Sequence, residues 1–96
     1  MNRNAMEDEV LGRCADDYEA PHTIAGDIAR TLGRPISEAE VRAAFLSLAS
    51  IGLVQSYAFD TSRGYVPISA AEASQQEAAW FMISAEGRKT YEVEAS

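Results

Sequence analysis

Signals that start and stop helices constrain this 96-residue chain more than any other feature of its sequence. The clearest start is Ser-Glu-Ala-Glu at residues 37–40, a capping box in which the side chains of Ser37 and Glu40 each hydrogen-bond to the other's backbone. Gly33 stands before it and Gly52 after it, and glycine suits the left-handed backbone on which helices commonly end. The chain therefore predicts a helix over residues 37–50 with a turn on either side.

Two more helices are expected before this one. The first covers residues 4–18 and ends before Pro21, because a residue that precedes proline avoids helical backbone. The second begins at Thr23, a good N-cap residue, and stops at Gly33. Apolar residues recur at helical spacing in all three helices, which predicts a buried stripe in each. The stripes are Met6, Val10, Leu11, Cys14 and Tyr18, then Ile24, Ile28, Ala29 and Leu32, then Val41, Ala44, Phe45 and Leu48.

Two strands are expected in the second half of the chain. Residues 53–59 alternate in strand fashion, and residues 79–83 can pair with them. A turn at residues 60–64 follows the first strand. Residues 65–68 extend only briefly, because Pro67 allows at most an edge strand. The side chains predicted to share one face of the first strand are Leu53, Gln55, Tyr57 and Phe59.

The segment between these strands is unusually long for a connection. Residues 69–77 are rich in Ala, Ser and Gln and show no strong period, and the whole of 65–79 exceeds the usual loop length. No basic residue occurs in it, which favours mobility or protein contact over a contact with DNA. After the second strand, Ser84 is placed to cap a final short helix that runs through about Val93.

Composition is that of a single folded domain spanning residues 1–96. A hydrophobic fraction of 47% argues against disorder, and no apolar run approaches the ~20 residues that a membrane span needs. The N-terminus lacks the apolar core of a signal peptide, and the single Cys14 has no partner for an internal disulfide. A cytoplasmic protein without a membrane partner is the expectation.

Two stretches resemble MarR- and PadR-like bacterial transcriptional regulators. SEAEVRAAFLSLASIGLV, residues 37–54, is similar to their recognition helix and first wing strand, with Leu48 and Gly52-Leu53-Val54 in the expected places. WFMISAEGRKTYE, residues 80–92, is similar to their second wing strand and the LTxxGR start of the next helix, with Ile83-Ser84 in place of Leu-Thr and Gly87-Arg88 in register. The resemblance implies an α+β winged helix-turn-helix: a three-helix bundle, a two-stranded wing and a short C-terminal helix.

Charge argues against a typical DNA reader. The net charge is −7, whereas affinity for DNA depends largely on neutralising phosphates. Only residues 30–63 are slightly basic, with four arginines against three acids. The face of the third helix opposite its apolar stripe contains no Arg, Lys, Asn or Gln, the side chains that best read base edges. That face consists of Ala39, Glu40, Ala43, Leu46, Ser47 and Ser50, and Ala43 stands where the MarR-like pattern often has a basic or polar residue.

Seven residues are candidates for DNA contact on this scaffold. They lie around the helix-turn-helix and at the tip of the predicted wing. Several have an alternative role: Arg42 can pair with Glu38 four residues earlier, Arg34, like the nearby Arg30, can be solvated, and residues 61–63 can form a plain surface turn. The candidates are Arg34, Ser37, Arg42, Ser47, Thr61, Ser62 and Arg63.

The sequence shows no catalytic constellation. His22 stands alone beside Pro21, Cys14 lies on an apolar stripe, and no further His or Cys is available for a conventional metal site with them. Trp80 and Phe81 are assigned to the core and sheet. We therefore expect no enzyme, cofactor or metal.

Two functions fit these features. The first is a regulator that binds double-stranded DNA as a homodimer, formed through the first or the last helix. The alternative is a winged-helix protein-interaction module that lacks sequence-specific DNA binding. In that case Leu46 and the small residues beside it on the third helix would form a docking patch, unless the first helix or the 65–79 segment covers them.

Overall fold

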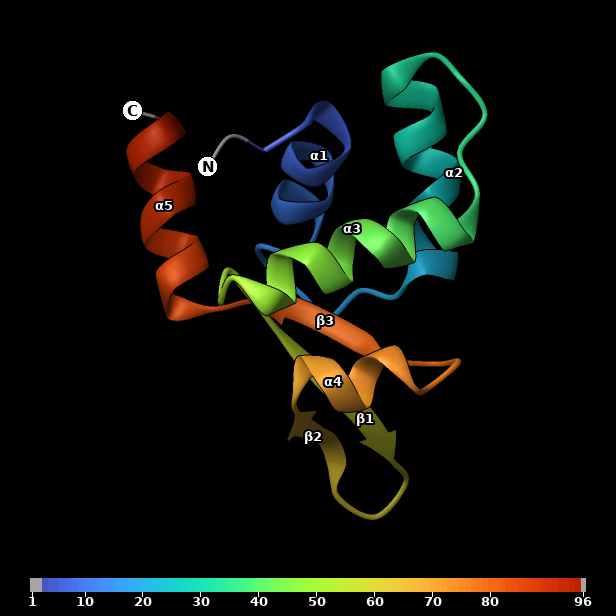
Figure 1. Cartoon of the computed structure of the whole chain (residues 1–96), viewed down its shortest axis with the longest axis vertical. Coiled ribbons are helices and arrows are strands. Elements are labelled where there is room, and N and C mark those ends of the chain that lie inside the picture. The colour runs from blue at the N-terminus through green and yellow to red at the C-terminus, as the bar shows by residue number, and fades with distance from the viewer. Residues whose placement is uncertain (1–2, 96) are drawn as a thin grey trace.

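The computed structural model describes residues 3–95 and belongs to the α+β class (Figure 1). Within that range five helices accompany one three-stranded antiparallel sheet. The helices are α1 (Ala5–Arg13), α2 (Pro21–Leu32), α3 (Glu38–Ser50), α4 (Ala70–Ser74) and α5 (Ala85–Ala95), and the strands are β1 (Val54–Asp60), β2 (Gly64–Ile68) and β3 (Trp80–Ile83).

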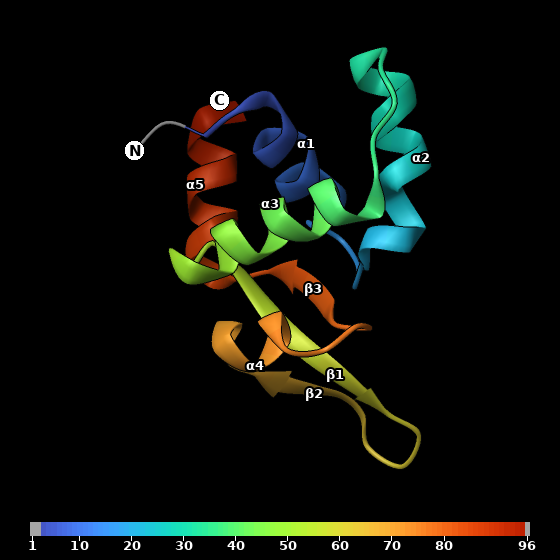
Figure 2. The ribbon, with the colours of Figure 1, turned by 45° about the vertical axis from the view of Figure 1, so that its right-hand side comes forward.

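Helix α3 lies at the centre of the molecule, between the other N-terminal helices and the sheet (Figures 1 and 2). Its capping box forms as predicted: the Glu40 N–H donates to Ser37 Oγ over 3.1 Å, and the Ser37 N–H donates to Glu40 Oε1 over 3.3 Å. The predicted stripe of α3 is buried, and its Phe45 stacks on Phe81 of β3 with the ring centroids 4.3 Å apart. This stripe therefore joins the helices to the sheet.

Helix α1 is shorter than the sequence predicts. It ends at Arg13 instead of residue 18, and Tyr18 leaves the predicted stripe. The chain beyond α1 pairs its backbone with β3: the Cys14 carbonyl accepts from the Ile83 N–H over 3.0 Å, and Glu19 and Phe81 exchange two hydrogen bonds of 2.8 Å. Pairing with a strand distant in sequence thus ends the helix. The remaining stripe residues Met6, Val10, Leu11 and Cys14 are buried as predicted.

The N-cap of helix α2 lies three residues earlier than predicted. Ala20 is the N-cap and Pro21 is the first helical residue, where its missing N–H and fixed φ are no disadvantage. Thr23 is therefore inside the helix, and its Oγ1 accepts a 3.1 Å hydrogen bond from the Ala20 N–H. The predicted stop is confirmed, because Gly33 adopts the left-handed conformation with φ of 70°.

The two predicted strands pair, but a third strand joins them. The order is β2-β1-β3, so β1 is central, and Ser56 stands opposite both Ile68 of β2 and Phe81 of β3. The 65–68 segment, which the sequence limits to a brief extension, forms a full edge strand that accommodates Pro67. Along β1, Val54 and Ser56 are buried while Gln55, Tyr57 and Phe59 lie on the other side.

Helix α4 is absent from the sequence prediction. It lies within the 65–79 segment and packs against α3 and β1 (Figure 2). Its Ala73 is fully buried. A capping box starts it: the Glu72 N–H donates to Ser69 Oγ, and the Ser69 N–H donates to Glu72 Oε1, each over 3.1 Å. The segment predicted as one long connection is therefore a strand and a helix separated by short turns.

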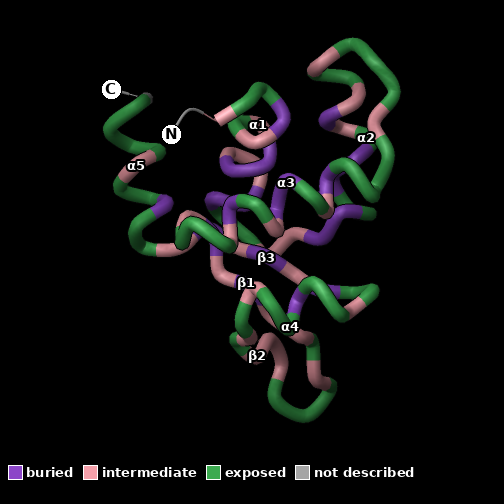
Figure 3. The backbone as a smooth tube through the Cα atoms, viewed as in Figure 1, coloured by how far each residue is buried: buried purple, intermediate pink, exposed green. Residues whose placement is uncertain are grey.

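Helix α5 begins at the predicted cap, with the Gly87 N–H donating to Ser84 Oγ over 2.9 Å. Gly87 is buried, and a Cβ on it would lie 1.9 Å from the Leu53 carbonyl oxygen. Arg88 donates through Nη2 to the carbonyl of Ala15. Gly87 and Arg88 thus hold α5 against the rest of the fold. Beyond this first turn α5 is largely exposed (Figure 3).

We predict that Gly87→Ala destabilises the protein by roughly 1–3 kcal/mol, because the added methyl group would overlap backbone that cannot move cheaply. Gly26→Ala is the matched control: Gly26 is exposed within α2, and its nearest neighbour to a new Cβ is the flexible Arg30 side chain at 4.0 Å. That substitution should stabilise by about 0.5–1 kcal/mol. Urea unfolding measures both, and an equal response of the two variants would contradict the close approach at Gly87.

Candidate interaction site

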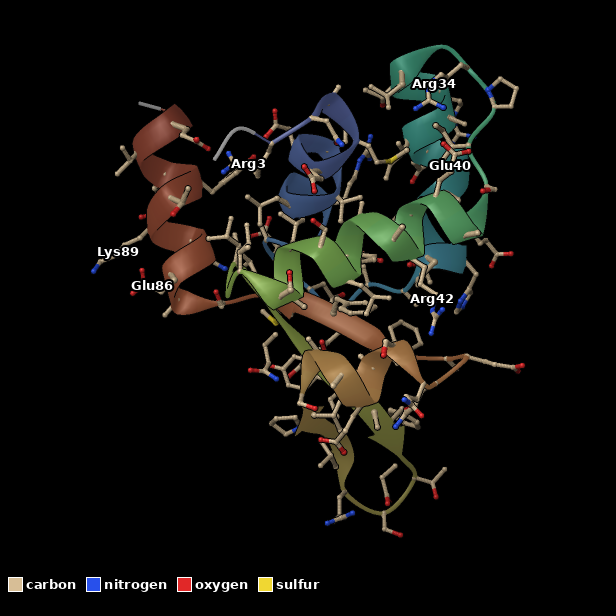
Figure 4. The ribbon with its side chains drawn as sticks, viewed as in Figure 1. Arg3, Arg34, Glu40, Arg42, Glu86 and Lys89 are labelled. Carbon is tan, nitrogen blue, oxygen red and sulfur yellow. The ribbon has the colours of Figure 1, made fainter. Side chains whose placement is uncertain are left out.

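Arg34 and Ser37, two of the predicted contact residues, bind the same carboxylate at the start of α3. Arg34 Nη1 lies 3.2 Å from Glu40 Oε2 (Figure 4). Ser37 caps the helix through its hydroxyl. The Arg34 guanidinium, followed by the Ser37 backbone, lowers the pKa of the Glu40 carboxyl below its usual value. The pair is solvent-exposed, so its energy is small, but a phosphate approaching Arg34 would meet the charge of Glu40.

Arg42, the one basic residue of α3, is bound to the end of α4. Its Nη2 donates to the carbonyl oxygens of Ser74 and Gln76, each over 2.8 Å, and to that of Ala73 over 3.3 Å. These oxygens lie at and beyond the C-terminus of α4, where a cation is favourable. The alternative predicted for Arg42, an ion pair with Glu38, does not form.

Ser47 faces α1. Its hydroxyl donates to Glu7 Oε2 over 2.8 Å, so this candidate ties α3 to the first helix. Leu46, on the neighbouring flank, is half-buried and packs against the core. Helices α1 and α4 both pack against α3, and the outward strip that remains exposed carries Glu40 among short side chains. Its residues are Ala39, Glu40, Ala43, Ser47 and Ser50.

The remaining three candidates lie at the β1–β2 turn. Thr61, Ser62 and Arg63 are all exposed, as predicted for a projecting turn. Asp60 organises the turn, since its Oδ1 accepts from the backbone N–H groups of Ser62 and Arg63 over 2.7 and 3.1 Å. Arg63 also lies 3.6 Å from Asp60 Oδ2, so its charge too has a carboxylate beside it.

The structure therefore places the seven candidates at two separate locations. Four surround α3 and three lie at the far tip of the hairpin. A hollow of about 250 Å³ lies beside the start of α3, and its charged lining is Glu38, Arg42 and Glu77. Two carboxylates against one guanidinium make this hollow unsuited to a phosphate group.

An aromatic cluster on the outward face of the sheet was missed by the sequence analysis. Tyr18 stacks on Tyr65 with centroids 3.8 Å apart and meets the edge of Tyr57 at 4.9 Å. Tyr65 also contacts Trp80 at 5.7 Å and Phe59 at 5.2 Å. The alternation of Tyr57 and Phe59 was a signal for this face, but the partners Tyr18 and Tyr65 come from segments predicted to be a helix and a brief extension.

The residues considered for catalysis have structural surroundings. Cys14 is fully buried, and burial raises the pKa of its thiol to about 12, so the reactive thiolate is suppressed at neutral pH. His22 meets the edge of Trp80, with ring centroids 5.7 Å apart. Phe81 belongs to the core as predicted, whereas Trp80 is half-buried on the outward face of the sheet.

Over residues 3–95, no group of three His, Cys, Asp or Glu side chains is arranged to hold a metal ion. Nor does any helix in this range have the length and apolar character needed to cross a membrane.

Comparison of the chain with protein-family models, with curated proteins and with solved structures finds no match.

We predict that Arg42→Ala loosens α4. The loss of three hydrogen bonds leaves partly buried carbonyl groups without this donor, which should cost roughly 1–3 kcal/mol of stability. Hydrogen exchange should accelerate at the Ala73 and Gln75 amides, which bond within α4. Arg30→Ala is the control, because the Arg30 side chain is 75% exposed and pairs only with Asp27 at the surface. If these amides exchange no faster in Arg42→Ala than in the wild-type protein, Arg42 does not hold α4 in place.

Proposed function

We propose that this chain is a winged-helix protein-interaction module and that it does not read duplex DNA. The observation that carries the proposal is that the Arg42 guanidinium donates its charge-assisted hydrogen bonds to carbonyl oxygens at and beyond the end of α4. A phosphate contact by Arg42 would require α4 to give up this donor. No other Arg or Lys is available on α3 to replace it.

The scaffold part of the proposal is supported by the order of the elements. Three helices precede a β-hairpin, a further strand and a last helix, as in the fold that the sequence resembles. The backbone pairing of Glu19 with Phe81 adds a short extended piece between α1 and α2, next to β3. Helix α4 and strand β2 are then an elaboration of the wing, inserted between the two strands predicted from the sequence.

The binding part is supported by the charges around α3 and the hairpin. Arg34 and Arg63 each have a carboxylate within 4 Å, and Glu38, Glu72 and Glu77 are exposed nearby on α3, α4 and the following turn. Binding to DNA gains much of its free energy when basic side chains displace counterions from the phosphates. A surface whose arginines already have carboxylates beside them gains little free energy in this way. Helix α4 also lies against the flank of α3 that adjoins the hairpin (Figure 2). In this position α4 would hinder insertion of α3 into the major groove of a DNA duplex.

We expect no saturable binding of a fluorescein-labelled random-sequence duplex in anisotropy titrations, even at about 50 mM salt, where electrostatic binding is strong. Arg34→Ala and Arg42→Ala serve as diagnostic variants. If the wild-type protein binds the duplex, and these variants each reduce the salt slope by about 1, then the DNA-binding prediction is right and the proposal fails.

The protein-partner arm uses a photo-crosslinking amino acid in the intact chain, in the cells that produce it. The test position is Ala43 on the outward strip of α3, and the control position is Gly26, exposed on α2. A protein adduct of defined mass that forms from Ala43 and not from Gly26 supports the proposal. Adducts of twice the chain mass would indicate the predicted homodimer. Adducts to nucleic acid alone would contradict the proposal.

A further inference from the structure

The outward face of the sheet carries a cluster of aromatic side chains, which α2 contacts through His22 at Trp80. The pairing of β1 with its neighbours places Tyr57 opposite Trp80 and Phe59 opposite Tyr65, with all four side chains on the side away from Val54 and Ser56. Helices α3 and α4 pack on the other side of β1. Tyr18 extends the aromatic face by stacking on Tyr65.

This aromatic face is ordered but remains accessible. Tyr18, Tyr57, Tyr65 and Trp80 are half-buried, and Phe59 is 55% exposed. Stacked and edge-on contacts hold the rings, so ordering them further on binding costs little entropy. Tyrosine and tryptophan are the residues most enriched at the energetic centres of protein interfaces, because they present large apolar area together with a polar tip.

Carboxylates border the aromatic face. Asp16 and Asp17 are exposed and immediately precede Tyr18, and Asp17 Oδ1 accepts a 2.7 Å hydrogen bond from the Tyr18 N–H. Asp60, at the end of β1, does not add to this border, because its carboxylate binds the turn and Arg63. No ion pair within residues 3–95 balances Asp16 or Asp17. Together with the net charge of −7, this border repels a phosphate backbone and attracts a cation.

We propose that this aromatic face docks a segment of a partner protein that carries arginine or lysine side chains. The cationic groups lie over the tyrosine and tryptophan rings, where the negative ring face attracts them, and the bordering carboxylates complement the same charge. This assignment rests on the proposed function, to which it adds a surface and the chemistry of the partner. Bases stacked on the same rings are the competing occupant, and the acidic border disfavours them.

The test uses Trp80, the single tryptophan of the chain, as a reporter within the aromatic face. The probes are four: a soluble peptide of alternating arginine and glycine, the corresponding lysine and glutamate peptides, and oligo-deoxythymidine. We expect the arginine peptide to change the Trp80 fluorescence saturably, the lysine peptide to bind more weakly, and the glutamate peptide and oligonucleotide to have no effect. Amide chemical shifts should change along β1, β2 and residues 16–18.

Two variants locate the binding. Phe59→Ala removes the most exposed ring of the face and should weaken binding of the arginine peptide about two- to fivefold, the range of one exposed cation–π contact. Asp16→Asn with Asp17→Asn keeps the hydrogen-bond acceptor of the loop but removes the charge, and should flatten the salt dependence of binding. The matched control is Val93→Ala, an apolar residue on α5 that is 73% exposed, with no expected effect.

Absence of a saturable response to the arginine peptide, or an equal response to the glutamate peptide, would overturn this assignment. Tighter binding of oligo-deoxythymidine would assign the face to single-stranded nucleic acid instead. These failures are distinct from failure of the proposed function, which depends on duplex binding and its loss in Arg34→Ala and Arg42→Ala. Unchanged thermal unfolding of the Asp16→Asn, Asp17→Asn protein excludes misfolding as the cause of any loss.

Discussion

The stacking of Phe45 on Phe81 is the contact on which the rest of the structure depends. Both rings are almost completely buried, and their planes are 7° from parallel. Phe45 comes from the central helix and Phe81 from the strand that pairs with both β1 and the α1–α2 connection. One contact therefore joins the helical bundle, the sheet and the chain that links the first two helices. Any displacement of α3 relative to β3 would open the core at its centre.

Arg42 holds α4 against α3 and so determines which part of the α3 surface stays exposed. A short helix such as α4 is marginal by itself and depends on packing and capping. It buries Ala73 against the core and receives Arg42 at its carbonyl end. The outward face of α3 that remains exposed carries alanine, serine and the carboxylate of Glu40. The guanidinium of Arg42, a candidate for ligand contact in the sequence, thus holds helix α4 in place.

The two sides of β1 have different roles as a result. One side carries Val54 and Ser56 into the core, where the Ser56 hydroxyl finds no hydrogen-bond partner within the described residues. The other side presents Tyr57 and Phe59 to solvent beside Tyr65 and Trp80. An alternating strand needs only one buried face in a domain of this size. The other face is available for interaction, and here it is aromatic with an acidic border.

Sequence by itself determined the helix caps at Ser37 and Ser84, the glycine stops, the buried stripe of α3 and the pairing of the two main strands. These features depend on neighbours a few residues away, so local chemistry is enough to specify them. The Ser69–Glu72 capping box was also present in the sequence and was a usable signal for α4. Only the tertiary structure decided where α1 ends, where Arg42 points and which rings meet Tyr65. Each of these results from contacts between residues far apart in the chain, whose geometry exists only once the core has assembled.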